Sequence, residues 1–311
     1  MISINIKDYN KPVPSVITVG TFDGIHLGHQ KLIDKVLSIS KSKNLRSIIL
    51  TFNPHPKVIL NNINKISLLT TQAEKNKILE SSNIDYMITQ EFSKEFSRLT
   101  PLDYVKTILV EKLNIKHIVI GYDHHFGRNR NANSDNLNEF SKLFNFQVSE
   151  VDVLTKDNTS VSSTKIRNLI SEGRVKEANS LLGYEFILSG NVIKGLGRGK
   201  KLGFPTANIL VDSDKIKPAN GVYFIKSIIN RKRVFGMMNI GENPTFNDKD
   251  FSIEVHFFDL EYDLYEQQLT IEIIDKIRNE IKFDSPEMLS SQLDVDKKKC
   301  FHLIKTIKKT I

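Results

Sequence analysis

Residues 20–29 combine three glycines with two histidines, and they form the first candidate site along the sequence. This segment follows a short apolar run and precedes a helical pattern, which predicts a loop that ends in the first turn of a helix. Glycines let the backbone approach a ligand closely, and the free N–H groups of a helix start favour an anion. His26 and His29 could both donate hydrogen bonds to phosphate, which suits a reaction that builds negative charge on phosphorus. A tight turn capped by a histidine is the alternative.

Residues 162–167 place hydroxyl groups and cations before a second apolar helix. Ser163 or Thr164 would ordinarily cap that helix, and capping alone is the alternative. Lys165 and Arg167 in the first turn are unusual, because cations there oppose the helix dipole. A bound polyphosphate would remove this conflict, which favours a phosphate site at this helix start.

A glycine-rich segment, residues 195–208, is the corresponding feature of the second half. Its four glycines and three cations suit a backbone cradle for phosphates, with contacts expected from Gly195, Gly199 and Lys200. The spacing fits neither the P-loop nor the G-x-G-x-x-G fingerprint. A flexible basic hairpin loop is the alternative.

Three polar side chains of the second half could act together. Thr206 and Asn208 alternate along one strand and therefore share a face, and their oxygen atoms are ligands suited to Mg²⁺. Glu254 lies in an otherwise apolar strand, either on its wet face or as a buried base. On the alternative interpretation, Thr206 and Asn208 are merely polar positions on a half-exposed strand.

Alternating strands and helices must position the first of these sites. Strands are expected at residues 16–19, 47–52, 85–89, 116–121 and 146–153. Helical patterns between them indicate βαβ units and a parallel sheet, whose ligands bind beyond the carboxyl ends of the strands.

After Gly183 the pattern changes to strands alone. Six are expected, at residues 186–193, 206–211, 222–229, 234–240, 252–258 and 269–274, followed by a helix at 285–309. Turn-rich pieces separate these strands, which predicts an antiparallel sheet or a closed barrel. We therefore expect two domains, residues 1–183 and 184–311.

Residues 20–29 and 162–167 together resemble the nucleotidyltransferase superfamily, whose members join a nucleoside monophosphate to a phosphorylated acceptor and release pyrophosphate. Residues 51–56 and 121–128 resemble the flavin-handling segments of the bacterial bifunctional riboflavin kinase/FMN adenylyltransferases, also called FAD synthetases. The resemblance implies a Rossmann-like nucleotidyltransferase domain with a parallel sheet. His124 stands where the family usually has Phe.

The same resemblance implies roles for individual residues. His26 and His29 would bind and stabilise the ATP phosphates as catalytic residues. The wider set of implied ATP or phosphate contacts is Gly20, Phe22, Asp23, Ser163, Thr164 and Arg167. The flavin would lie near Asn53, Pro54 and Asp123.

Residues 203–208, 239–246 and 263–265, with Glu254, occur in family order and resemble the riboflavin kinase module, a six-stranded antiparallel barrel with a terminal helix. The resemblance implies that Thr206 and Asn208 hold Mg²⁺ and ATP phosphate, and that Glu254 deprotonates the ribityl 5′-hydroxyl. Arg278 and Phe283 would belong to the segment that closes over flavin. Lys200 replaces a common Arg, and Glu266 replaces the Gly that usually follows Leu-Tyr.

The composition excludes several classes of protein. The 311 residues carry a net charge of +8 and one cysteine, Cys300, which excludes an internal disulfide framework and a cysteine-rich zinc site. Cys300 is expected to be a small core residue. No apolar stretch reaches the roughly 18 residues of a membrane span, and no signal-peptide pattern is present, so a cytoplasmic protein is expected.

The basic charge leaves a nucleic-acid-binding protein as a rival. That class predicts aromatic residues interleaved with basic ones, but the Lys-rich C-terminal segment has only Phe301 nearby. We therefore expect no nucleic-acid and no membrane partner. The resemblance implies an enzyme that phosphorylates riboflavin to FMN with ATP and adenylylates FMN to FAD, releasing pyrophosphate. Weak self-association is left open.

Overall fold

The computed structural model describes residues 1–10, 12–63, 66–122, 125–128, 131–156, 159–195, 198–242, 251–260 and 263–310. They group into two units, Met1–Ser163 and Thr164–Ile311. This grouping assigns the two helices before residue 183 to the second unit. The sequence pattern changes at residue 183 instead. The domain boundary expected there stays a prediction.

The first unit contains a parallel sheet, as expected, but with six strands rather than five, in the order β1-β4-β3-β2-β5-β6. Its strands are β1 (Ile2–Asn5), β2 (Ser15–Val19), β3 (Arg46–Asn53), β4 (Tyr86–Glu91), β5 (Ile115–Gly121) and β6 (Gln147–Val151). The edge strand β1, which pairs with β4, was not expected because its four residues are too short a run for a clear period.

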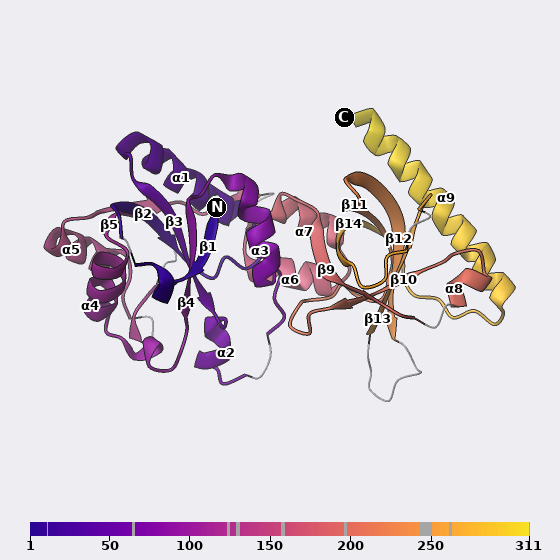
Figure 1. Ribbon diagram of the computed structural model, residues 1–311, viewed down its shortest axis with the longest axis horizontal. Helices are drawn as coiled ribbons and strands as arrows, with labels where there is room; N and C mark the ends of the chain where they lie inside the picture. The colour runs from indigo at the N-terminus through magenta and orange to yellow at the C-terminus, as the bar shows by residue number, and fades with distance from the viewer. Residues whose placement is uncertain are drawn as a thin grey trace. The chain divides into compact units, whose positions relative to one another are not determined.

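Helices cover both faces of this sheet. They are α1 (Leu27–Lys43), α2 (Pro56–Leu60), α3 (Gln72–Leu79), α4 (Pro101–Asp103), the π-helical η4 (Tyr104–Lys112) and α5 (Ser134–Phe144). Short 3₁₀ turns η1 (Ile6–Asp8), η2 (Glu80–Ser82) and η3 (Phe96–Arg98) and the hairpin of β7 (Thr155–Lys156) and β8 (Thr159–Ser160) complete the unit. Alternate strand residues pack with α1 and α3 in one apolar cluster and with η4 and α5 in another. Figure 1 shows α1 and α5 beside the sheet. Burial on both faces explains why the strands read as continuous apolar runs.

The strand order sets where a ligand can bind. The chain runs from β2 to its neighbour β3 on one side and later returns to β5 on the other side of β2. Such a reversal opens a crevice beyond the carboxyl ends of the strands. The loop that follows β2 starts at this point.

The second unit is a closed antiparallel barrel, also as expected, with strand order β10-β13-β12-β11-β14-β9. Its strands are β9 (Phe186–Ile193), β10 (Ala207–Val211), β11 (Gly221–Ile229), β12 (Lys232–Glu242), β13 (Phe251–Phe257) and β14 (Gln268–Arg278). Its helices are α6 (Ser163–Ser171), α7 (Val175–Leu182), α8 (Arg198–Lys201) and α9 (Pro286–Thr310). Ser163, the first residue of α6, is the last residue of the first unit.

The terminal helix α9 lies along the outside of the barrel (Figure 1). Cys300 and Ile304 of α9 pack against Phe204, Phe224 and Phe258, so Cys300 is the buried core residue that was expected. Burial raises the pKa of its thiol to about 12. No helix in the described part of the chain has the length and apolar character needed to cross a membrane.

Candidate active sites

The loop between β2 and α1 has a strained backbone. Phe22 and Ile25 adopt φ values of 46° and 37°, and Gly24 adopts 88°. The left-handed region costs a non-glycine residue about 1–2 kcal/mol. Phe22 and Ile25 are nevertheless fully buried in the apolar cluster beneath α1, and this burial offsets the strain. Strained backbone that its surroundings enforce is concentrated at binding and catalytic sites.

The buried side chain of Asp23 holds this loop against residues 69 and 70. Its buried carboxylate accepts hydrogen bonds from the backbone N–H groups of Leu69, at 3.2 Å, and Thr70, at 3.0 Å. The Asp23 carbonyl accepts a hydrogen bond from the hydroxyl of Ser163 at 2.8 Å. Asp23 therefore shapes the loop, and its direct contact with ATP stays a prediction.

The two histidines lie against each other at the start of α1. His26 caps the helix, because its Nδ1 accepts the backbone N–H of His29 at 3.3 Å, so a neutral His26 ring carries its proton on Nε2. The ring centroids of His26 and His29 are 3.7 Å apart and nearly parallel. A Cβ on Gly28 would lie 3.2 Å from the His26 ring, which explains the glycine between the histidines.

His29 has an unsatisfied ring nitrogen. Within the described residues its Nδ1 is buried and has no hydrogen-bond partner. Burial, with the nearby His26 and Lys75, holds the pKa of His29 well below 6.5. An unpaired buried polar atom costs about 1–3 kcal/mol, so this nitrogen marks a place where a ligand would be stabilising.

Lys75 of α3 is a residue of this site that the sequence analysis missed. It is only 6% exposed, and its Nζ donates a hydrogen bond to the Thr21 carbonyl at 2.7 Å. The signal that could have found it is its position four residues before the buried Leu79, on the same face of α3.

The other predicted phosphate contacts fall on both sides of the unit boundary. Ser163 is tied to the histidine loop through Asp23. Thr164 and Arg167 lie on α6 and belong to the second unit. Their binding to the same phosphate as the histidines stays a prediction. A Cβ on Gly20 would lie 3.3 Å from the Phe22 ring, so Gly20 permits the close turn after β2.

Asn53 and Pro54, predicted near the flavin, lie exposed at the end of β3 and are joined by a cis peptide bond. Asp123 and His124 lie outside the described residues. The sequence analysis missed an aromatic row beside Asn53, with successive ring centroids 5.5 to 6.0 Å apart: Phe52, Phe92, Phe96, Tyr104 and Phe126. The buried Tyr104 hydroxyl has no hydrogen-bond partner among the described residues, and burial raises its pKa.

The barrel brings its three predicted polar residues together. Thr206 donates a hydrogen bond from its hydroxyl to a Glu254 carboxylate oxygen at 3.3 Å. The antiparallel register places Asn208 of β10 and Asn239 of β12 on either side of Glu254. Glu254 is half-buried, so it combines access to solvent with a fixed polar surrounding.

Two glycines let the preceding loop approach this cluster. A Cβ on Gly195 would overlap the Asn208 carboxamide, and one on Gly199 would overlap the Phe204 carbonyl oxygen. The loop contains the short helix α8, on which Lys200 is exposed. Leu196 and Gly197 lie outside the described residues, as does the motif at 243–246.

His256, also missed from the sequence, supports the cluster. The Pro205 carbonyl can only accept a hydrogen bond, so the His256 Nδ1, 2.8 Å away, carries a proton and donates it. The ring packs edge-on against Phe204 and Phe258, and its burial lowers its pKa. His256 thereby holds the residue directly before Thr206.

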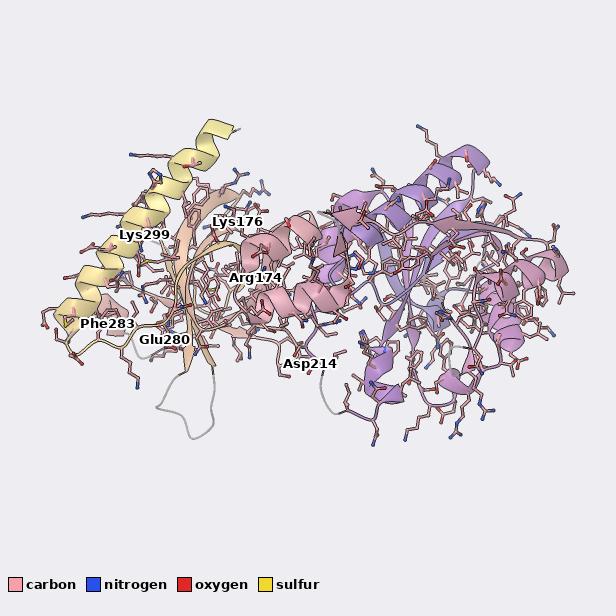
Figure 2. All side chains as sticks on the ribbon, turned by 180° about the vertical axis from the view of Figure 1, so that it is seen from behind. Arg174, Lys176, Asp214, Glu280, Phe283 and Lys299 are labelled. Carbon is pink, nitrogen blue, oxygen red and sulfur yellow. The ribbon has the colours of Figure 1, made fainter. Side chains whose placement is uncertain are left out.

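The Arg278 side chain, predicted to contact flavin, forms an ion pair with the terminal helix. Its Nε donates to Asp296 of α9 at 2.8 Å, and the Asp296 carboxylate is fully buried. Its guanidinium carbon lies 5.8 Å from the centre of the Phe283 ring. Figure 2 shows Glu280 and Phe283 on the segment between β14 and α9, which Arg278 anchors. Direct contact of Arg278 with flavin stays a prediction.

No group of three or more His, Cys, Asp or Glu side chains is arranged to hold a metal ion within the part of the chain that the structure describes. The donors near Glu254 are instead a hydroxyl and an amide. Hard oxygen donors of this kind suit Mg²⁺ when phosphate and water complete its coordination.

Comparison with known proteins assigns each unit to a family. The model of the FAD synthetase family matches residues 8–165, and that of the riboflavin kinase family matches residues 182–304. The bifunctional riboflavin kinase/FMN adenylyltransferase of Buchnera aphidicola subsp. Schizaphis graminum is 40% identical over 96% of this chain and 97% of its own length. The enzyme of the same name from Listeria monocytogenes is 39% identical over 93% of this chain and 91% of its own length.

A solved structure extends the likeness to the whole fold. A crystal structure of a macrolide-efflux protein from Streptococcus pneumoniae matches with a TM-score of 0.88 and 33% identity, covering 96% of this chain and 97% of that chain. With both family models matched in order and relatives of one name aligned along nearly the whole length, this chain belongs to the family of bifunctional riboflavin kinase/FMN adenylyltransferases.

Proposed function

We propose that residues 1–183 and residues 184–311 each carry out one of two ATP-dependent steps that convert riboflavin to FAD. The barrel transfers the γ-phosphoryl group of ATP to riboflavin, giving FMN and ADP. The α/β unit then joins the AMP part of ATP to FMN, giving FAD and pyrophosphate. The observation that carries this proposal is the presence of two separate polar sites, one in each unit, each within a different matched family. We place the boundary between the activities at residues 183/184.

In the adenylylation step, a phosphate oxygen of FMN attacks the α-phosphorus of ATP, and the bond to pyrophosphate breaks. Negative charge grows on the phosphate oxygens, where positioned donors stabilise it. His26 and His29 supply ring N–H groups, and the unpaired Nδ1 of His29 gains a partner. Ser163, Thr164 and Arg167 hold further phosphate oxygens, while Gly20, Phe22 and Asp23 shape the loop that receives them.

For the flavin ring, the aromatic row offers rings that pack edge-on against one another, of which Phe52, Phe92 and Phe96 are only partly buried. Aromatic contacts gain about 0.5–1.5 kcal/mol per pair beyond burial. We propose that the isoalloxazine packs against these partly buried rings beside Asn53 and Pro54, with Asp123 nearby.

In the kinase step, the ribityl 5′-oxygen attacks the γ-phosphorus, the bond to ADP breaks, and Glu254 takes the hydroxyl proton. Thr206 and Asn208 are suited to hold Mg²⁺, which would neutralise charge on the ATP phosphates when bound. Gly195, Gly199 and Lys200 line the phosphates, and the anchored segment that follows Arg278 closes over flavin.

The experiment incubates the purified full chain with riboflavin, ATP and Mg²⁺ and separates the flavins. Glu254→Gln should stop the formation of FMN from riboflavin while added FMN still becomes FAD. His29→Gln should leave the kinase intact, so that FMN accumulates. In each variant, the unaltered reaction shows that the other unit is intact. If both variants, folded by circular dichroism, stop both steps, the division of labour is wrong.

A further inference from the structure

Lys75 is a buried cation that the two reactions described above do not use. It lies on α3, a helix that begins with a reciprocal cap between Thr71 and Glu74. Lys77 of the same helix is exposed, as is usual for lysine, whereas Lys75 is 6% exposed. A lysine normally extends its ammonium to water, so a buried one needs compensating contacts.

The ammonium of Lys75 fixes the start of the histidine loop. Its Nζ donates to the Thr21 carbonyl at 2.7 Å, and this is its only hydrogen bond among the described residues. The Thr51 hydroxyl of β3 donates to the same oxygen at 3.2 Å. Two donors from different elements therefore set the peptide plane directly before Phe22, the first left-handed residue of the loop.

The same ammonium acts electrostatically on His29. Burial is the largest cause that lowers the pKa of His29, and the stacked His26 and then the Lys75 charge add to it. The ligand-free loop thus combines a fixed ammonium with a neutral ring whose Nδ1 has no partner in the described chain. A polyphosphate entering here would counter the ammonium charge and favour uptake of one proton from solvent by His29.

We propose that Lys75 is a positioning residue of the adenylylation site, which orients the loop through the Thr21 carbonyl and keeps His29 neutral until an anionic ligand enters. This proposal rests on the assignment of the histidine loop to FMN adenylylation. It predicts that the ligand-free and ligand-bound sites differ by one proton on His29.

The first test compares Lys75→Met, which removes charge and donor, with Lys77→Met, the matched exposed lysine. We expect Lys75→Met to lower kcat for FAD formation about tenfold to a hundredfold, because a misplaced loop misaligns the reacting groups. Because the ligand-bound site holds a proton on His29, kcat/KM should fall as pH rises through the pKa of His29 in the free protein. Without the ammonium, His29 takes up its proton at higher pH, so this fall should move to higher pH. Lys75→Arg keeps the charge and should keep the fall at its original pH. Lys77→Met should change neither quantity.

Circular dichroism controls for folding of the chain, and the riboflavin kinase activity shows that the barrel is intact. If folded Lys75→Met matches the wild type both in its FAD-forming kcat and in the pH above which kcat/KM falls, the proposal is overturned. If the wild-type chain forms no FAD from FMN, the assignment of the loop has failed instead. The two failures are therefore distinguishable.

A second test uses the wild-type chain and does not depend on whether a variant folds. The ring signal of His29 is followed by NMR from about pH 5 to 9 and assigned by its loss in His29→Gln. With pyrophosphate, a product of adenylylation, we expect the ring to titrate at higher pH than without it. An unchanged titration in the presence of bound pyrophosphate would falsify the proton uptake.

Discussion

The two sites hold their reactive groups by different means. In the α/β unit, the histidines follow a loop whose shape depends on left-handed Phe22 and Ile25 and on donors from distant segments. In the barrel, strand register places Asn208 opposite Glu254. A loop site can combine groups from several strand ends, but it stores strain. A site that strand register positions needs little strain, but it tolerates little change in how closely a neighbouring loop backbone approaches it.

The sites also share one device. In each, a buried basic side chain donates a hydrogen bond to a backbone carbonyl beside the reactive groups. Lys75 bonds to Thr21 in the α/β unit, and His256 bonds to Pro205 in the barrel. Four features can therefore be tested by substitution. They are the close approach of a glycine backbone, the hydrogen bond to a backbone carbonyl, the protonation of a buried histidine and the strain of a left-handed residue.

The largest effect is expected from Gly195→Ala, which tests close approach in the barrel. The added Cβ would overlap the Asn208 carboxamide and displace it. Displacement of about 1 Å can cost about 100-fold in rate, so riboflavin kinase activity should fall by that factor while FAD formation from FMN is unchanged. Gly203→Ala is the control for backbone strain alone, because Gly203 has a φ of 79° but no atom lies within 4 Å of its Cβ, and it should lower kinase activity less. Wild-type kinase activity in Gly195→Ala would show that the loop is not constrained in this way.

A smaller effect is expected from His256→Leu, which tests carbonyl support. The change leaves the Pro205 carbonyl without its donor, a loss of about 1–1.5 kcal/mol, or roughly tenfold in kinase kcat if it is felt at Thr206. His256→Gln keeps a donor and should recover part of the rate. His302, exposed on α9, provides the control His302→Leu. Equal kcat values for the Leu and Gln variants of His256 would contradict the role of the donor.

A pH effect on stability should come from His117 of β5 in the α/β unit. Its Nε2 pairs with the Ser149 hydroxyl at 2.8 Å, and burial, with Lys43 and Lys35 nearby, lowers its pKa from 6.5 to about 4. Between these values the unfolded chain binds a proton that the native chain does not, so stability falls as pH drops through this window.

Urea unfolding of His117→Gln, followed from about pH 7 to 4, should therefore show a flatter pH dependence in the α/β unit than the wild type. The exposed His125 supplies the control His125→Gln, which should retain the wild-type slope. An unchanged slope in His117→Gln would show that other groups cause the acid sensitivity.

Sequence patterns predicted most of the strands and helices, but not the side chains that hold the loops of the two sites in place. Strands with strong periods were predicted in both units, because a sheet buried on two faces and an alternating barrel leave clear signatures. Thr206 and Glu254 were identified as site residues from residue type and family resemblance, but the hydrogen bond between them was not predicted. Lys75 and His256 were missed because each bonds to a segment distant in sequence. The spacing of Lys75 from the buried Leu79 is the only local feature that separates it from the exposed Lys77.

The smallest effect is expected at Glu266, where backbone strain has no compensation. Glu266 is exposed with φ 62°, unlike Phe22, whose similar φ is offset by burial of its ring. Glu266→Gly should relieve about 1–2 kcal/mol of strain and lose about 0.5–1 kcal/mol to chain entropy, stabilising the barrel by about 0.5–1 kcal/mol.

Denaturant unfolding of the barrel checks this against Glu266→Ala, which removes the charge but keeps the strain. Both variants should retain both activities. If Glu266→Gly and Glu266→Ala unfold at the same midpoint, left-handed strain does not limit the barrel. The difference between the two sites would then lie in the hydrogen bonds that hold the histidine loop rather than in backbone strain.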